Sequence, residues 1–282
     1  MKKYAVVDLM GGFGNQIFQY SFGKELSNKG FKVSFDSSNY ETRKLENNII
    51  PLDRELVFTP SFFNFSEVDK NLKKIILFLK KTKLSNTFFS PLRLFNDKNY
   101  GDLNPKIFNK YSGYWQKINV IEKNKNFLIK ELSKNKILKE GFSRKPEQGS
   151  CMLHIRRGDY LAMDEALSLD FYQQAINTLS KNIKNFNYTI FTDDYEWAKK
   201  QNTFYDAKRI QKSSSTIDET LKDFSEMVSF ENYIVGNSTF PLIAALLGST
   251  DESRVIIADP WFRNSFKNLG FNNNWIKIEN SL

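Results

Sequence analysis

The chain has 282 residues, 40% of them hydrophobic and 15% aromatic, which is enough for one large domain or two of ordinary size. Its single cysteine and single histidine exclude an internal disulfide framework and argue against a zinc site built from those ligands. The net charge of +9 favours nucleic acid, an anionic membrane surface or a phosphorylated small molecule as partner, although the lysines are spread over the whole chain.

The first residues lack the pattern of a secretion signal. Met1, Lys2 and Lys3 begin as such a signal would, but Asp8 interrupts the apolar run and glycines follow at once. No apolar segment approaches the length that a bilayer-spanning helix needs. The sequence therefore predicts a soluble, cytoplasmic protein.

Residues 1–35 predict a strand, a glycine-rich turn, a helix and a second strand. Residues 4–9 and 31–35 have the pattern of strands, and residues 17–29 place apolar side chains close to one helical face. Gly12 lies in the turn, where a glycine lets the backbone approach a ligand closely.

Two other interpretations of this turn stay open. Gly12, Gly14 and Asp36 match part of a dinucleotide-binding fingerprint, but the third glycine of that fingerprint is missing. Alternatively, the segment is an ordinary turn in which Asn15 caps the helix.

Residues 41–109 are less informative, apart from one amphipathic segment. Apolar residues recur at helical spacing among many lysines, at Leu72, Ile75, Ile76 and Leu79. The segment is expected to be a helix with one face in the core and a lysine-rich face in water. The alternative is a basic amphipathic surface that rests on anionic lipid.

A possible domain boundary follows the next motif. Residues 113–116 read Gly-Tyr-Trp-Gln, and residues 118–138 have a helical pattern. The aromatic side chains of the motif would pack in the core, or stack on a sugar if exposed. Residues 140–150 contain glycines and a proline, which predicts a linker. The expected domains are therefore residues 1–145 and 146–282.

The most informative stretch lies just after this boundary. Residues 151–155 predict a buried strand, and Arg156, Arg157, Gly158 and Asp159 follow it directly. Open α/β sheets bind ligands at the C-terminal ends of their strands. Because the guanidinium group is a planar fork of donors that suits phosphate oxygens, the arginine pair predicts a phosphate site.

A second strand ends in paired acids. Residues 170–183 predict a helix, residues 188–191 a strand, and residues 196–200 a further helix, with Asp193 and Asp194 between the last two. Three interpretations stay open for the acids: capping of the following helix, contact on the nucleotide side, or a site for Mg²⁺ or Mn²⁺.

A second candidate anion site lies near the end of the chain. Residues 219–230 predict a helix and residues 233–235 a strand, after which Asn237, Ser238 and Thr239 open a helix to residue 247. Backbone amides and hydroxyls at a helix N-terminus bind anions, although an ordinary N-cap would have the same sequence. Residues 254–258 predict another strand.

These motifs resemble a known family. His154-x-Arg156-Arg157-Gly158-Asp159-Tyr160 is similar to the signature of the bacterial α-1,2-fucosyltransferases, glycosyltransferase family 11, within a wider His-x-Arg-Arg fucosyltransferase superfamily. Residues 11–20, 113–116, 191–194 and 223–240 also resemble motifs of this family, in the same order. Residues 241–243, Pro-Leu-Ile, depart from the usual Ser-Trp-Trp, which leaves local packing and acceptor choice in doubt.

The resemblance implies a fold. Alternating strands and helices in both halves predict an α/β protein with parallel sheets. The family implies the GT-B arrangement, two Rossmann-like domains facing each other across a cleft. Residues 1–145 would form the acceptor-side domain, and residues 146–282 would bind GDP-fucose.

The resemblance also implies an activity. It is the inverting transfer of L-fucose from GDP-β-L-fucose to the 2-hydroxyl of a terminal galactose, in a surface polysaccharide or O-antigen glycan. No metal and no cofactor are expected. A lipid-linked acceptor would bring the enzyme into peripheral contact with the cytoplasmic face of the inner membrane.

Site residues follow from the matching motifs. Arg157 would neutralise the leaving diphosphate, helped by donors at the other motif positions, namely Arg156, Ser238 and Thr239. His154 and Asp223 resemble residues on the guanine side, while Asn15 and Gly12 lie in the loop that faces the donor phosphates and acceptor. Asp164 is the expected general base, with Asp159 as the alternative.

Three other functions stay open. A fucosyltransferase of different linkage or acceptor fits the same motifs. A nucleic-acid-binding protein would explain the charge, but no basic motif of that kind is present, so nucleic acid is not an expected partner. A nicotinamide-dependent oxidoreductase would explain the first 35 residues but not the arginine pair.

Overall fold

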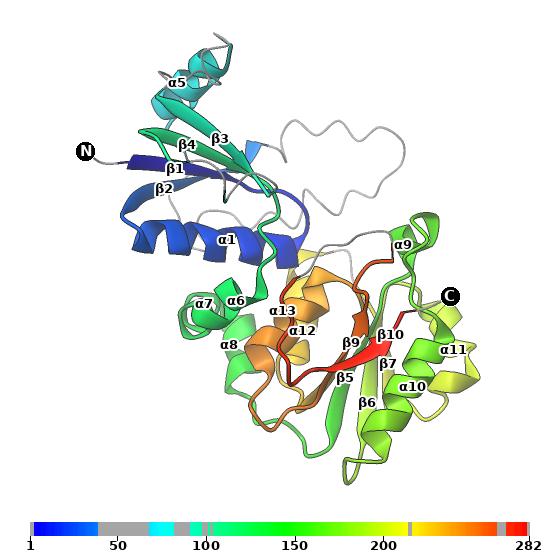
Figure 1. The fold of residues 1–282 in the computed structure, drawn as a ribbon. Coiled ribbons are helices and arrows are strands. Elements are labelled where there is room, and N and C mark those ends of the chain that lie inside the picture. Colours follow the sequence, from blue (N-terminus) through cyan, green and yellow to red (C-terminus); the bar gives the residue numbers. More distant parts are fainter. Residues whose placement is uncertain are drawn as a thin grey trace. The chain divides into compact units, whose positions relative to one another are not determined.

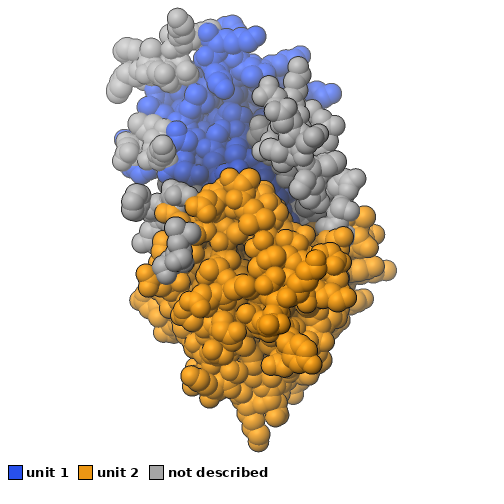
Figure 2. Space-filling view, turned by 90° about the vertical axis from the view of Figure 1, so that its right-hand side faces the viewer, with its two compact units in different colours: residues 1–131 blue, residues 132–282 orange. Residues whose placement is uncertain are grey.

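The computed structural model describes residues 3–38, 68–81, 91–97, 101, 104–213, 216–263 and 269–280. The chain divides into two compact units, residues 1–131 and 132–282 (Figure 2). Each unit contains its own parallel β-sheet, which confirms the predicted α/β class. No helix in the described ranges combines the length and apolar character needed to cross a bilayer.

Unit 1 has a four-stranded sheet in the order β2-β1-β4-β3, with every pair parallel. Its strands are β1 (Lys3–Asp8), β2 (Phe31–Asp36), β3 (Leu92–Asn96) and β4 (Phe108–Ser112). Its helices are α1 (Phe13–Asn28), α5 (Lys70–Lys81), α6 (Ile118–Lys123) and α7 (Lys125–Leu132). Helix α1 lies along β1 and β2, and α5 lies against β3 (Figure 1).

The first predicted unit, β1-α1-β2, is confirmed, whereas β3 and β4 were not predicted. Strand β4 contains Asn109 and Lys110, polar residues that disfavour a strand prediction. The structure satisfies Asn109 internally, because its amide bonds the backbone of Lys106 and the carbonyl of Tyr4. Tyr111 stacks on Phe95 with ring centroids 4.6 Å apart, which joins β4 to β3.

Unit 2 has a six-stranded parallel sheet in the order β10-β9-β8-β5-β6-β7. Its strands are β5 (Ser150–Ile155), β6 (Asn187–Thr192), β7 (Arg209–Lys212), β8 (Asn232–Val235), β9 (Val255–Asp259) and β10 (Ile276–Glu279). Every residue of the central strand β5 is buried, as expected for a strand covered on both faces.

Helices cover both faces of this sheet. They are α8 (Lys136–Ser143), α9 (Gly158–Ala162), α10 (Leu169–Ser180), α11 (Tyr195–Lys199), α12 (Ile217–Met227) and α13 (Thr239–Gly248). Helices α10 and α11 lie on one side, and α8, α12 and α13 on the other (Figure 1). The short helix α9, which follows the arginine pair, was not among the predicted helices.

The predicted helix 118–138 is divided among α6, α7 and α8, and the predicted linker 140–150 is only partly confirmed, because α8 continues to Ser143 and only residues 144–149 lie outside helices and strands. Asn124 separates α6 from α7, and Asn135 caps α8 by accepting from the amides of Ile137 and Leu138. Helix α8 packs on α12, where the Ser225 hydroxyl donates to the Ile137 carbonyl at 2.5 Å. The chain therefore enters unit 2 at Leu132, earlier than the predicted boundary at residue 145.

Candidate functional site

The candidate site of unit 2 lies at the C-terminal edge of its sheet. Strands β6, β5 and β8 are neighbours, and each is followed directly by polar residues of the predicted motifs. These residues are Asp193 and Asp194 after β6, Arg156 and Arg157 after β5, and Asn237 and Ser238 after β8. Because the strands are parallel, one edge of the sheet brings together segments distant in sequence.

Asp193 holds the arginine loop in place. Its carboxylate accepts hydrogen bonds from the backbone amides of Arg157 (2.9 Å) and Gly158 (3.1 Å). It also pairs with Nη1 of Arg156 at 3.1 Å. A Cβ atom at residue 158 would come within 3.0 Å of this carboxylate, so the close approach favours glycine there.

The two arginines differ in how many of their donors are occupied. Arg156 uses Nε and Nη2 on Asp159, both at 2.9 Å, and Nη1 on Asp193. Arg157 bonds Asp194 through Nε alone, at 3.1 Å, and its guanidinium lies 3.7 Å from the centroid of the Trp197 ring. No described residue bonds Nη1 or Nη2 of Arg157. Within the described part of the chain, this arginine therefore has an unbonded pair of donors.

Asp194 has a second role, which confirms the capping interpretation for this residue. Its other carboxylate oxygen accepts from the amide of Trp197 at 3.2 Å and so caps α11. Its own amide donates to the buried Thr192 hydroxyl at 3.0 Å. Both acids after β6 are thus engaged by the arginines. Among the described residues, no group of three or more His, Cys, Asp or Glu is placed to hold a metal.

His154 is a buried residue of β5. Burial, together with the charge of Arg156, lowers its pKa from 6.5 to about 3, so the imidazole is neutral. Its Nδ1 has no hydrogen-bond partner among the described residues. Gly236, after β8, packs against it, since a Cβ there would meet the His154 carbonyl at 2.6 Å and Nδ1 at 3.0 Å.

Ser238 and Thr239 open α13, as predicted. Ser238 is the N-cap residue, but its side chain makes no capping hydrogen bond to the helix. The hydroxyl of Tyr160, in α9, donates to the Asn237 carbonyl at 3.1 Å. Burial raises the pKa of this tyrosine to about 12, so it remains a donor. The segment after the arginines is thereby tied to the start of α13.

The two candidate bases have different surroundings. Asp159 is paired with Arg156. Asp164 is exposed, adopts a left-handed backbone with φ of 55°, and has no hydrogen bond from its carboxylate to any described residue. The loop is anchored immediately afterwards, where the Glu165 carboxylate accepts from the Arg263 amide at 2.8 Å. Non-glycine residues with positive φ are uncommon and often lie at functional sites.

Asp223 lies in the body of α12. It is six positions after Ile217, the first residue of the helix, which corresponds to about 9 Å along the axis. The side chain is buried. Its charge helps to raise the pKa of Arg209, whose main partner is Glu226. A contact with guanine at this position stays a prediction.

In unit 1, the first and second motifs meet at the C-terminal edge of the sheet. Gly12 is the N-cap of α1, and Asn15 accepts from the Gln116 amide at 2.7 Å. Gln19 is fully buried and bonds the backbone of Met10 and of Gly113. Gln19 was not predicted as a site residue, although a glutamine among the apolar residues of a helix is a signal that its amide bonds buried backbone groups.

The aromatic residues of the second motif are divided between core and surface. Trp115 is buried and stacks on Phe22 with centroids 4.2 Å apart, which confirms packing for this residue. The Asp97 carboxylate accepts from the amides of Tyr114 and Trp115, both at 3.0 Å. The Tyr114 side chain is exposed. Of the two rings, Tyr114 is therefore the one available to a ligand.

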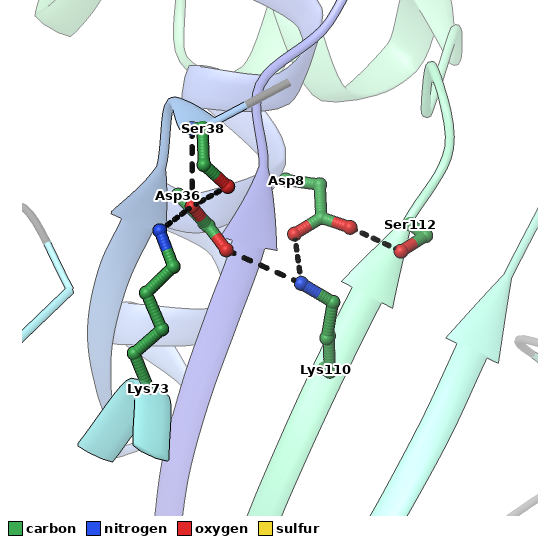
Figure 3. A network of polar contacts seen from close by, with 6 residues as sticks. All are labelled: Asp8, Asp36, Ser38, Lys73, Lys110 and Ser112. Carbon is green, nitrogen blue, oxygen red and sulfur yellow. Dashed lines mark hydrogen bonds and ion pairs between the residues drawn. The ribbon is translucent and has the colours of Figure 1, made fainter. Parts of the chain in front are cut away.

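A charged network lies beside this loop (Figure 3). Lys110 joins the carboxylates of Asp8 (2.5 Å) and Asp36 (3.4 Å), at the ends of β1 and β2. Burial raises the pKa of Asp36, but hydrogen bonds from Ser38 and Lys73 and the charge of Lys110 outweigh it and lower the pKa to about 2. The charges of these residues are thus compensated within unit 1.

The site of unit 2 defines a class of protein. A parallel sheet that presents arginine donors and a helix N-terminus at its C-terminal edge is suited to the phosphates of a nucleotide. The chain belongs to glycosyl transferase family 11, whose model matches residues 6–279. This confirms the family that the sequence motifs resemble.

Two characterised relatives cover almost the whole chain. An α-1,2-colitosyltransferase of Escherichia coli is 27% identical over 97% of this chain and 98% of its own length. The O-antigen biosynthesis glycosyltransferase WbnK, also of Escherichia coli, is 24% identical over 96% of this chain and 99% of its own.

Solved structures of other glycosyltransferases are more distant. A FUT1 variant of Arabidopsis thaliana in complex with GDP has a TM-score of 0.45 at 10% identity, covering 91% of this chain and 70% of that one. The fucosyltransferase NodZ from Bradyrhizobium has a TM-score of 0.42 at 13% identity, covering 88% and 93%. The heptosyltransferase WaaC of Escherichia coli has a TM-score of 0.45 at 8% identity, covering 98% and 92%.

The buried neutral state of His154 predicts a pH dependence of stability. Between about pH 6.5 and pH 3 the unfolded chain binds a proton at this residue and the folded chain does not, so the free energy of unfolding falls as the pH falls. We expect a slope approaching ~1.4 kcal/mol per pH unit in the middle of this window. Urea unfolding between about pH 5 and pH 7 measures it, since carboxylates titrate mainly below that range.

The variant His154→Gln provides the comparison. Because His154 is the only histidine of the chain, the variant should lose most of this slope. Identical pH dependence of the two proteins would contradict a buried neutral imidazole.

Proposed function

We propose that the protein transfers L-fucose, with inversion, from GDP-β-L-fucose to the 2-hydroxyl of a terminal galactose in a glycan of the O-antigen type. Residues 132–282 would bind the donor, and residues 1–131 would bind the acceptor. The observation that carries the proposal is the free donor edge of Arg157 at the C-terminal edge of the unit 2 sheet.

The chemistry requires fixed donors at this position. As the sugar–phosphate bond breaks, negative charge grows on the β-phosphate of the departing GDP. Nη1 and Nη2 of Arg157 can donate to two of its oxygens, and the amides at the start of α13 add their partial positive charge. Arg156 and Ser238 would support this site. Donors that are already in place stabilise such charge without rearrangement.

The acceptor hydroxyl must lose a proton as it attacks the opposite face of the sugar. We propose Asp164 as the base, because its carboxylate has no partner among the described residues, whereas that of Asp159 is paired with Arg156. Asn15 would orient the acceptor, since Gln116 fixes its amide.

The sugar of the donor is the open alternative. The colitosyltransferase relative raises the possibility of GDP-colitose, whose sugar is fucose without its 3-hydroxyl. A transfer assay should compare the two donors on a panel of galactose-terminated acceptors, with linkage analysis of the product. We expect GDP-fucose to be preferred. Exclusive use of GDP-colitose would contradict this preference.

We also expect transfer activity to survive EDTA, because arginine supplies the positive charge. Loss of activity with EDTA and its rescue by Mn²⁺ would contradict a metal-independent reaction.

The variant Arg157→Lys tests the leaving-group role. Lysine retains the charge but loses the forked pair of donors. We expect kcat to fall by roughly 10²–10³, the usual cost of losing one transition-state donor. Arg254→Lys is the matched control, because Arg254 is exposed and precedes β9, at the opposite edge of the sheet from the proposed site. A kcat for Arg157→Lys close to wild type would place the leaving group elsewhere.

We also propose that the enzyme is cytoplasmic and rests on the inner membrane through α5. This helix contains five lysines and no acidic residue, and it exposes Ile75, Leu77 and Phe78. Lysines beside exposed apolar side chains suit the surface of an anionic bilayer. A lipid-linked acceptor would be reached at that surface.

Sedimentation with phosphatidylglycerol vesicles tests this contact. The double variant Leu77→Ser and Phe78→Ser should remain in the supernatant, while transfer to a soluble acceptor is unchanged. Tyr205→Ser is the matched control, because Tyr205 is a similarly exposed aromatic residue of unit 2. Equal sedimentation of the double variant and wild type would contradict the role of α5.

A further inference from the structure

Arg157 is held from two directions by one short segment. Asp194 binds its Nε at 3.1 Å, and the ring of Trp197, three residues later, lies 3.7 Å from the centre of the guanidinium. The first contact occupies one edge of the planar group and the second covers one face. The edge that carries Nη1 and Nη2 is left without a bond to any described residue.

Trp197 is itself fixed by structure below it. Its amide donates to Asp194, whose amide in turn donates to the fully buried Thr192 at the end of β6. The indole packs on the core of unit 2 and makes an edge contact with Phe204, with centroids 6.0 Å apart. The sheet therefore fixes the position of the guanidinium, through Asp194 and Trp197, although the aliphatic part of the arginine side chain is flexible.

We propose that Trp197 is a positioning residue, which holds the guanidinium of Arg157 so that its two terminal nitrogens are directed at the diphosphate of the donor. The inference rests on the proposed function and deepens it. An arginine stacked on an aromatic face keeps all its in-plane donors available. Its rotamers are already restricted before the nucleotide binds, so less entropy is lost on binding.

Calorimetric titration of GDP into wild type and variants measures the effect. We expect Trp197→Leu to weaken GDP binding roughly tenfold, the size of a partly desolvated cation–π contact. Trp197→Phe should retain most of the affinity, because phenylalanine retains an aromatic face. Tyr205→Leu is the control for loss of an aromatic ring and should bind GDP as wild type does, since Tyr205 is 89% exposed.

A double-mutant cycle separates positioning from direct contact. If Trp197 acts through Arg157, Trp197→Leu should have no further effect on GDP affinity in an Arg157→Ala background. An equal loss in both backgrounds would show that Trp197 contacts the nucleotide directly or only supports the fold, and would overturn the inference. Pyrophosphate should give the same pattern as GDP, because the proposed contact involves the diphosphate.

A replacement variant and the GDP affinity of the wild type separate failure of the inference from failure of the proposed function. Where circular dichroism shows that Trp197→Leu is not folded, Trp197→Met replaces it in the cycle, because the adaptable methionine side chain fills the space in the core without an aromatic face. If Arg157→Ala loses GDP binding but shows no coupling to either variant in the cycle, the inference is overturned and the proposed function is not. Failure of wild type to bind GDP would overturn the proposed function and, with it, the inference.

Discussion

The candidate site of unit 2 depends on the carboxylate of Asp193. It accepts from two successive backbone amides of the arginine loop and pairs with Arg156, so it fixes where the chain leaves β5. Hydrogen bonds from neutral donors to a charged acceptor are stronger than those between neutral groups, and two of them converge on this carboxylate together with the ion pair to Arg156. Since Asp193 follows β6 and the loop follows β5, the site is built only when these two strands pair.

The carboxylates around this loop occupy the donors of the two arginines to different extents. Three aspartates face two arginines, and each acid is engaged. Nη1 and Nη2 of Arg157 nevertheless have no bond to any residue that the structure describes, because Asp194 divides its two oxygens between Nε of the arginine and the cap of α11. A carboxylate that bound both terminal nitrogens of Arg157 would compete with a phosphate for them. The capping role of Asp194 thus leaves the arginine available.

The sequence was most informative where strands are buried on both faces. Strands β5, β6, β8 and β9 are short apolar runs, and all were predicted, whereas β3, β4 and β7 contain charged residues and were missed. The motifs located the edge of the sheet correctly. The family resemblance assigned the leaving-group role to Arg157, but the sequence could not show which arginine has its donors occupied, because the partners Asp193 and Asp194 lie more than thirty residues away and become neighbours only through the pairing of β5 with β6.

The two units use their sheet edges differently, and the difference supports placing the donor in unit 2. In unit 1 the charged groups at the edge neutralise one another, since Lys110 joins Asp8 and Asp36, and Lys73 completes the network. Within this network of described residues, no positive charge is left unmatched for a diphosphate. The amide of Asn15 and the exposed ring of Tyr114, at the same edge, suit a neutral sugar. An anionic donor is therefore better matched by the free donors of Arg157, and an uncharged acceptor by the edge of unit 1.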